Sequence, residues 1–141
     1  MSAIKKIVVG TDGSDNSVAA LRWAIAEAKV HGATVDVVYS WQFPPVMDPM
    51  GVSLLPNPEE MNASADQLLA EVLSKVDVSG VSVTSHVLRG TPAAALITAA
   101  KQADLLVIGR RGHGGFMGLL LGSVAQQVVH HAPCAITVVP A

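Results

Sequence analysis

Short apolar runs alternate along this chain with longer segments of helical periodicity. Each run is five to eight residues long, is rich in valine, isoleucine or leucine, and is bounded by glycine, proline or polar residues, which is the pattern of a β-strand. We predict strands over residues 4–9, 33–40, 81–88, 104–108 and Ala135–Val139. The third run alternates apolar and polar positions, which predicts a strand at the edge of a sheet.

Between these runs, apolar residues recur at the three- and four-residue spacing of a helix. In the first such segment Val18, Leu21 and Ile25 share one face, a helix start is expected near Ser14, and Gly32 is a suitable C-terminal stop. Further helices are predicted over residues 57–76, 91–102 and 123–131. Residues 41–56 contain four prolines and predict a long loop, of the kind that covers a binding site or is mobile.

Strict alternation of strands and helices predicts an α/β fold. Helical crossovers require parallel strands, and right-handed crossovers give an open, doubly wound sheet of five strands in the order 3-2-1-4-5 with four helices, a Rossmann-like arrangement. The strand order reverses between the first and fourth strands, and ligands bind at such a switch point. Thr11 and Asp12 follow the first strand, and Gly109 and Arg110 follow the fourth, so both pairs are expected at one crevice.

Length and composition narrow the class of protein. The 141 residues are expected to form a single domain, residues 1–141, and half of them are hydrophobic, with only 4% aromatic, which predicts an aliphatic core. The formal net charge of −2 gives no indication of binding to nucleic acid or to a membrane surface. No apolar run is long enough to span a membrane. A lone Cys134 excludes an internal disulfide, fits a reducing cytoplasm and is expected to be a buried structural thiol.

The loop after the fourth strand contains the residues that are best suited to binding a ligand. Residues 109–112 read Gly-Arg-Arg-Gly, and Gly122-Ser123 follows after nine further residues, where the last helix begins. Glycines that allow close approach, together with the N–H groups of a helix N-terminus, form a phosphate cradle. Arg110, Arg111 and His113 can add positive charge. The loop is neither a Walker A loop nor a dinucleotide fingerprint, because it has no Gly-Lys-[Ser/Thr] and lacks the third glycine of that fingerprint.

A structural interpretation of the same loop stays open. Ser123 and Gln126 have the spacing of a capping box, so Ser123 can serve as a helix cap alone, and the glycines can form turns alone. Asp12 can likewise form an Asx-turn after the first strand without touching a ligand.

The loop fills every fixed position of Gly-x2-Gly-x9-Gly-[Ser/Thr], the signature of ATP-binding universal stress proteins. Residues 7–14, Ile-Val-Val-Gly-Thr-Asp-Gly-Ser, also resemble the first strand and acidic turn of that family, as do residues 120–124 and 131–134 near the end. The resemblance covers essentially the whole chain and implies one domain of the single-domain, ATP-binding type.

The resemblance implies an adenine-nucleotide site. It places Asp12 beside the ribose, the backbone near Ser40 beside the adenine, and the loop around the triphosphate, with Mg²⁺ or Mn²⁺ held through the phosphates and no metal site made by the protein alone. The residues expected to contact the nucleotide are Thr11, Asp12, Ser40, Ile108, Gly109, Arg111, Gly112, His113, Gly122, Ser123 and Val124. Ala125 and Arg110 depart from the family pattern, in which hydroxyl residues are common at both positions, and this leaves ATP, ADP and AMP as alternatives.

We predict a nucleotide-binding regulatory protein of the stress response without efficient turnover and with no catalytic residue. It is expected to be cytoplasmic, to form a homodimer through the apolar strand Ala135–Val139, and to act on a signalling partner of unknown identity. Two alternatives stay open. One is a slow ATPase or phosphotransferase that uses Asp12 or His113, and the other is a dimeric interaction module that binds no nucleotide.

Overall fold

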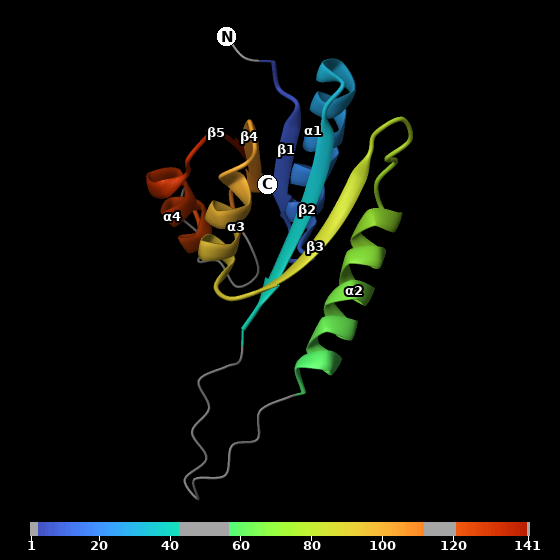
Figure 1. Ribbon diagram of the computed structural model, residues 1–141, viewed down its shortest axis with the longest axis vertical. Coiled ribbons are helices and arrows are strands. Elements are labelled where there is room, and N and C mark those ends of the chain that lie inside the picture. The colour runs from blue at the N-terminus through green and yellow to red at the C-terminus, as the bar shows by residue number, and fades with distance from the viewer. Residues whose placement is uncertain (1–2, 43–56, 112–120, 141) are drawn as a thin grey trace, which may run out of the picture.

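The computed structural model of this chain describes residues 3–42, 57–111 and 121–140. Strands and helices alternate through these residues in the predicted order (Figure 1). The elements are β1 Lys6–Gly10, α1 Asp15–His31, β2 Thr34–Trp41, α2 Pro58–Ser74, β3 Val83–Arg89, α3 Pro92–Ala100, β4 Leu105–Gly109, α4 Ser123–His131 and β5 Ala135–Val139.

The strands form one parallel sheet in the order β3-β2-β1-β4-β5, which confirms the predicted doubly wound topology. β1 lies at its centre, and its Ile7 and Val9 are in register with Leu105 and Val107 of β4. The chain moves outward from β1 through β2 to β3, and then returns to the other side of β1 for β4 and β5. The carboxyl ends of β1 and β4 therefore flank the switch point of the sheet.

Two helices cover each face of the sheet. α1 and α2 pack on one face, where Ile7, Val9 and Leu21 are fully buried, and α3 and α4 pack on the other, where Val8 and Leu106 are fully buried (Figure 1). Neighbouring residues of β1 thus serve opposite layers, because side chains alternate across a strand. The central strands are apolar on both faces because each face is covered.

Side-chain caps and glycine fix several helix ends. The hydroxyl of Ser14 accepts a 3.3 Å hydrogen bond from the N–H of Ser17 at the start of α1, and Gly32 ends this helix with a left-handed φ of 66°. Thr91 caps α3 in the same way, through the N–H of Ala94. The predictions for the other ends were slightly too long: α2 ends at Ser74, although Val76 still packs into the core, and α3 ends at Ala100.

The edge position of β3 is confirmed, although this strand begins at Val83 and not at residue 81. Its Thr84 and Ser85 are exposed, whereas Val83 and Val87 are partly buried against the α1 and α2 layer. A strand with one neighbour and partly solvated faces produces the alternation seen in the sequence.

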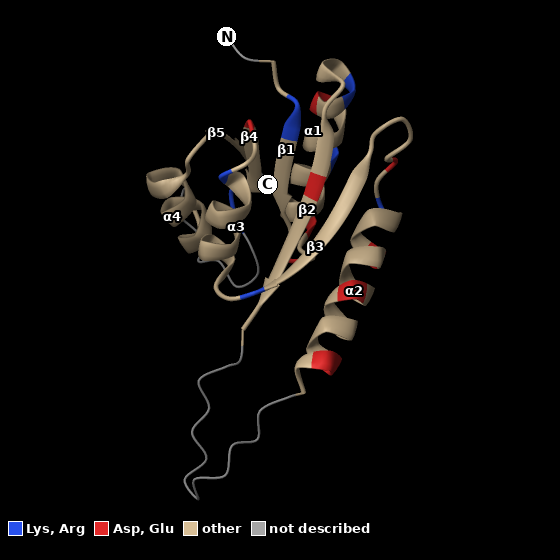
Figure 2. Cartoon of the chain, in the orientation of Figure 1, with Lys and Arg blue, Asp and Glu red and all other residues tan. Residues whose placement is uncertain are grey.

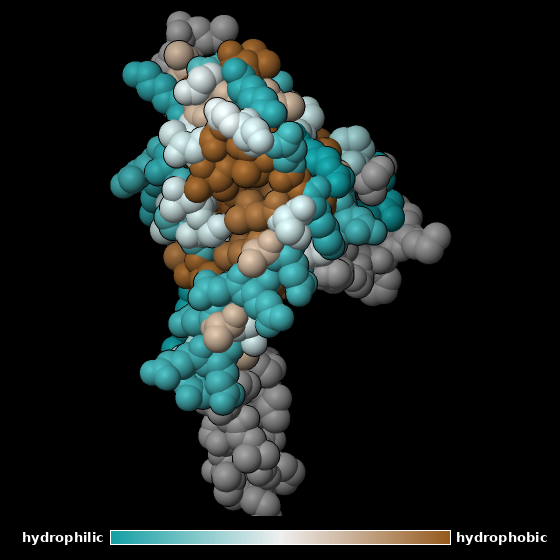
Figure 3. All heavy atoms as spheres, turned by 90° about the vertical axis from the view of Figure 1, so that its right-hand side faces the viewer, coloured by the Kyte–Doolittle hydropathy of each residue, from teal (hydrophilic) through white to brown (hydrophobic). Residues whose placement is uncertain are grey.

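Charged residues lie mainly in the helices and towards the ends of strands (Figure 2). Those of α2 are all acidic and all exposed. Seen from the α2 side, a hollow with an apolar floor is framed by hydrophilic side chains (Figure 3). Among the described residues, no helix has the length and apolar character that crossing a membrane requires.

Cys134 lies just before β5 and is half-buried, less than expected from the sequence. Its thiol contacts the carbonyl of Ala135 at 3.4 Å. Burial, with a smaller contribution from the Asp104 carboxylate, raises the pKa of this thiol above its ordinary value. A thiol that stays protonated is a poor nucleophile, which fits a structural role.

Candidate functional site

Two loops meet at the carboxyl edge of the sheet, as the sequence predicted. Residues 11–14 follow β1 and lead into α1, and residues 110–111 follow β4. β1 and β4 are adjacent and parallel, so both loops leave the sheet at the same edge. α1 begins at this edge on one face of the sheet and α4 on the other. The region between their N-termini, at the switch point of the sheet, is the candidate site and is called the crevice below.

Thr11 is held by a chain of hydrogen bonds inside the first loop. Its N–H donates to the carbonyl of Val38 at 3.0 Å, and its hydroxyl lies 2.9 Å from the hydroxyl of Ser17, which donates to the carbonyl of Ser14 at 2.8 Å. Because the proton of Ser17 is used in that way, the hydroxyl of Thr11 is the donor to Ser17, and it accepts from the N–H of Gly13. The Thr11 side chain, 8% exposed, is therefore committed to the fold.

Asp12 forms the Asx-turn that the sequence allowed. Its Oδ1 accepts a 2.9 Å hydrogen bond from the N–H of Ser14, and Gly13 between them has a φ of 84°. A Cβ on Gly13 would also lie 3.3 Å from Leu68 of α2, so glycine is favoured here both by its φ and by the close packing. The turn fixes the position of the half-buried Asp12 carboxyl at the edge of the crevice.

Ser40 presents its backbone toward the same crevice. β1 ends opposite Val38, whereas β2 continues to Trp41 and, in the part of the chain that the structure describes, pairs there with β3 alone. The carbonyl of Val38 points toward the β1 side, where it accepts from Thr11. Alternate residues of a strand direct their backbone groups to the same edge, so the N–H and C=O of Ser40 point to the side that β1 has left. This is the geometry expected for recognition through the backbone.

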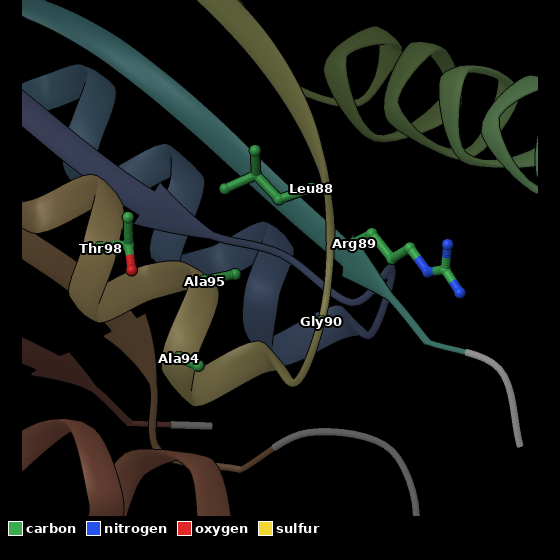
Figure 4. Close-up of a pocket in the computed structure, with 6 residues that line it drawn as sticks. All are labelled: Leu88, Arg89, Gly90, Ala94, Ala95 and Thr98. Carbon is green, nitrogen blue, oxygen red and sulfur yellow. The ribbon is translucent and has the colours of Figure 1, made fainter. Parts of the chain in front are cut away.

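A shallow pocket of about 240 Å³ lies one strand beyond Ser40, between the end of β3 and α3 (Figure 4). Its lining is mostly apolar and includes Leu88, Ala95 and Thr98. The guanidinium of Arg89 points away from this pocket and lies 5.5 Å from the ring centre of Trp41. The wall of the pocket is therefore mostly apolar, although Arg89 is one of its lining residues.

Asn16, in the first turn of α1, joins the two loops and was missed by the sequence analysis. Its Oδ1 accepts a 2.8 Å hydrogen bond from the N–H of Arg111, and its Nδ2 donates to the carbonyl of Val139 at 3.1 Å. A Cβ on Gly109 would lie 2.8 Å from Oδ1 of Asn16. The first glycine of the loop is thus required by the approach of Asn16. An asparagine two residues after a cap gives no sequence signal for a contact 95 positions away.

Arg110 and Arg111 follow β4 directly and are the positively charged residues at this edge of β4. The N–H of Arg110 donates to the carbonyl of Val139, and its carbonyl accepts a 2.8 Å hydrogen bond from the N–H of Gly122, which closes the loop at its base. Both side chains are half-buried, and within the described part of the chain their Nε atoms are buried without a hydrogen-bond partner. A buried cationic donor in this state fits an anionic ligand.

The N-terminus of α4 lies beside these arginines. The N-cap is Gly122, with φ −70° and ψ 170° and no side-chain cap, so the capping-box interpretation of Ser123 was wrong. Gln126 instead donates to the carbonyl of Leu121 at 3.0 Å. The first helical hydrogen bond runs from the N–H of Gln126 to the carbonyl of Gly122. The N–H groups of residues 123–125 precede it and are directed out of the helix end.

The flanking apolar residues can contribute only through their backbones. Ile108 and Ala125 are each 3% exposed and belong to the cluster under α3 and α4, and Val124 packs against it. The side chain of Ala125, a methyl group where a hydroxyl residue is common, therefore lies in the core. Gly112 and His113, which the sequence also assigned to the nucleotide, lie outside the described residues, as do residues 43–56 of the long loop.

Comparison with known proteins gives one family. The model of the universal stress protein family matches residues 3–140. A universal stress protein of Thermus aquaticus is 36% identical over 138 residues, covering 96% of this chain and 98% of its own length. One from Mycolicibacterium smegmatis is 33% identical, and there the chain spans 47% of the relative. The crystal structure of a universal stress protein in complex with cAMP superposes with a TM-score of 0.75 at 28% identity, covering 99% of this chain and 98% of that one.

Proposed function

The chain belongs to the universal stress protein family, and from this premise we propose that it is a regulatory protein that binds an adenine nucleotide between β1 and β4. The nucleotide is ATP, or ADP or AMP in its place. The protein acts in the stress response, in the cytoplasm, as a homodimer that signals occupancy of the crevice to a partner. It does not turn the nucleotide over efficiently.

The observation that carries this proposal is the donor set for phosphate. Arg110 and Arg111 follow β4 at this place, and the Nε atoms of their cationic side chains are buried without a hydrogen-bond partner among the described residues. The N–H groups of Ser123 and Val124 leave the first turn of α4 beside them, where the helix dipole also favours negative charge. Two of these groups are cationic side chains and two are backbone N–H donors, so the set suits a phosphate chain held by its oxygens, and Mg²⁺ or Mn²⁺ would be held through the phosphates.

The other end of the crevice suits a nucleoside. Asp12 supplies a carboxyl group, a natural acceptor for ribose hydroxyls, on a turn that its own Oδ1 stabilises. Ser40 supplies backbone groups beside an apolar pocket, a surface that fits the edge and face of a base. The 28% identical relative that was crystallised with cAMP supports the adenine-nucleotide class.

The same geometry favours binding over catalysis. The hydroxyl of Thr11 is engaged with Ser17, and Oδ1 of Asp12 is engaged with Ser14. Rapid hydrolysis requires a group that orients water against the terminal phosphate, in addition to charge stabilisation. Side chains committed to the turn after β1 are poorly placed for that task. The second candidate function is a slow ATPase or phosphotransferase that uses Asp12 or His113.

One experiment tests the nucleotide proposal. The protein is purified without added nucleotide and denatured, and the released ligand is identified by mass spectrometry, followed by titration of the emptied protein with ATP. Release or binding of ATP, ADP or AMP, with little phosphate formed from added ATP, is the expected result. Steady phosphate release would favour the ATPase. No released nucleotide and no binding would favour the interaction module.

The homodimer is proposed from the open edge of β5. Within residues 3–42, 57–111 and 121–140 this strand pairs with β4 only, and the carbonyl of Val139 points inward, where it accepts from Arg110. By alternation the backbone of Val138 points outward, toward a second copy. Val138→Pro removes an outward N–H and should weaken a dimer measured by sedimentation, whereas Thr137→Pro removes an inward N–H and should destabilise the fold. A monomeric parent protein would refute this part of the proposal.

A further inference from the structure

The end of β5 and the base of the glycine loop are tied to a single side chain. The carbonyl of Val139 accepts hydrogen bonds from the N–H of Arg110 at 2.9 Å and from Nδ2 of Asn16 at 3.1 Å. Oδ1 of Asn16 accepts from the N–H of Arg111 at 2.8 Å. A carboxamide is suited to this place because it accepts and donates at once, whereas a carboxylate only accepts.

The same segment is tied to α4. The carbonyl of Arg110 accepts from the N–H of Gly122, the N-cap of α4. Arg110 therefore contacts the last residue of β5 through its N–H and the start of α4 through its carbonyl. Asn16 holds the next residue, Arg111, to α1. The phosphate-side elements of the candidate site and the last residue of the edge strand form one hydrogen-bonded unit.

We propose that Asn16 is a positioning residue that couples the crevice to the β5 edge, so that nucleotide binding and self-association through β5 strengthen each other. The proposal rests on the proposed function. A nucleotide that orders Arg110 and Arg111 also orders the carbonyl of Val139 and hence the end of β5. A second copy then pairs with a strand that is already ordered, so dimerisation loses less conformational entropy. By linkage, the dimer binds the nucleotide more tightly by the same factor.

The test compares the dimer dissociation constant, measured by sedimentation velocity, with and without saturating ATP. In the parent protein ATP should tighten the dimer by about fivefold or more, the lower range of allosteric coupling. Asn16→Ala removes both contacts, and Asn16→Asp removes the donor to Val139 while it keeps the acceptor for Arg111. Both variants should bring the ratio close to one. Asp15→Ala, an exposed residue on the same turn, is the matched control and should keep the parent ratio.

Amide hydrogen exchange in the nucleotide-free protein checks the contact itself. The Arg111 amide should exchange about tenfold faster in Asn16→Ala, while Asn16→Asp should keep it protected. Unchanged protection in Asn16→Ala, or an unchanged dimer ratio in both Asn16 variants, would overturn the proposal. Direct titration of the parent with ATP separates the two possible failures. Absence of binding refutes the proposed function, whereas binding with a dimer ratio of one refutes the coupling alone.

Discussion

Oδ1 of Asn16 lies 2.8 Å from the backbone nitrogen of Arg111 and accepts its hydrogen bond, although the two residues are 95 positions apart. This contact sets the path of the chain where it leaves β4. Gly109 passes so close to Asn16 that an added Cβ would lie 2.8 Å from Oδ1 and 2.9 Å from Cγ. The first glycine of the signature therefore has a reason that involves no ligand, namely room for the side chain that holds the loop.

Gly109→Ala should destabilise the protein by about 1–3 kcal/mol, the usual cost of forcing extra atoms into a packed site. The cost should fall in an Asn16→Ala background, because Oδ1 and Cγ are then absent. It should not vanish, since the backbone carbonyl of Asn16 would still lie 3.2 Å from the new Cβ. Urea denaturation of the parent, the two single variants and the double variant measures this coupling.

An equal cost of Gly109→Ala in both backgrounds would show that Asn16 is not what requires glycine. The nucleotide affinity of the double variant tests a second role of this glycine. If the first glycine also serves close approach to phosphate, Gly109→Ala should weaken ATP binding in the Asn16→Ala background as well, whatever its cost in stability there.

The fold was predictable because its signals are local and repeated. β1 and β4 are fully covered, so they appear as unbroken apolar runs, and β3 alternates because it lies at the edge. Alternation with helices then leaves few topologies. The ends of α2 and α3 were predicted too late because residues such as Val76 still pack into the core after the helix has ended.

The candidate site was predictable in its backbone and less so in its side chains. Glycines and a helix start marked the loop, but which residue caps α4 depends on the path of the chain, and the cap is Gly122. The inward direction of the Thr11 hydroxyl depends on Ser17, six positions further along the chain. The role of Asn16 depends on contacts across the sheet, to Arg111 and Val139. Such long-range hydrogen bonds leave no periodic trace in a sequence.

Thr11 provides a test of side chains that are structural although they lie beside the site. Thr11→Val keeps the shape but removes the hydroxyl that accepts from the N–H of Gly13 and donates to Ser17. Leaving these partners unsatisfied in a buried place should cost about 1–3 kcal/mol. Thr11→Ser keeps the hydroxyl and should lose less stability. Thermal and urea denaturation of both variants measure the difference, and equal losses would contradict the hydrogen-bond chain.

Asp104 predicts how stability changes in acid. Its Oδ2 accepts hydrogen bonds from the N–H groups of Lys5 at 2.9 Å and Lys6 at 3.0 Å, and these bonds lower the pKa of the carboxyl below its ordinary value. A folded-state pKa below the unfolded one gives stability that is present above the unfolded pKa and is lost as pH falls through the folded pKa.

Asp104→Asn keeps an acceptor oxygen but removes the charge. The variant should be less stable than the parent at pH 7, and the gap should narrow as pH falls below about 4, the ordinary range of an aspartate. Urea denaturation at several pH values measures the gap. Asp15→Asn, an exposed carboxyl at the opposite edge of the sheet, is the control for a general charge effect. A gap that is constant with pH would contradict the role of the charge.

Ser123 allows the backbone donor of α4 to be removed by itself. Proline is well tolerated at the first position of a helix, where Ser123 lies, and it has no N–H. The extended conformation of Gly122, with φ −70° and ψ 170°, is also the one that a following proline requires. Ser123→Pro should therefore keep the fold, which far-UV circular dichroism and thermal denaturation check.

Ser123→Ala removes the hydroxyl alone and is the matched control. If phosphate is held by the helix N-terminus, the proline variant should bind ATP about tenfold or more weakly than the alanine variant. That factor corresponds to one hydrogen bond to a charged group, about 1.5–3 kcal/mol. Equal affinities in calorimetric titration would remove α4 from the nucleotide site and leave Arg110 and Arg111 as the phosphate ligands to examine.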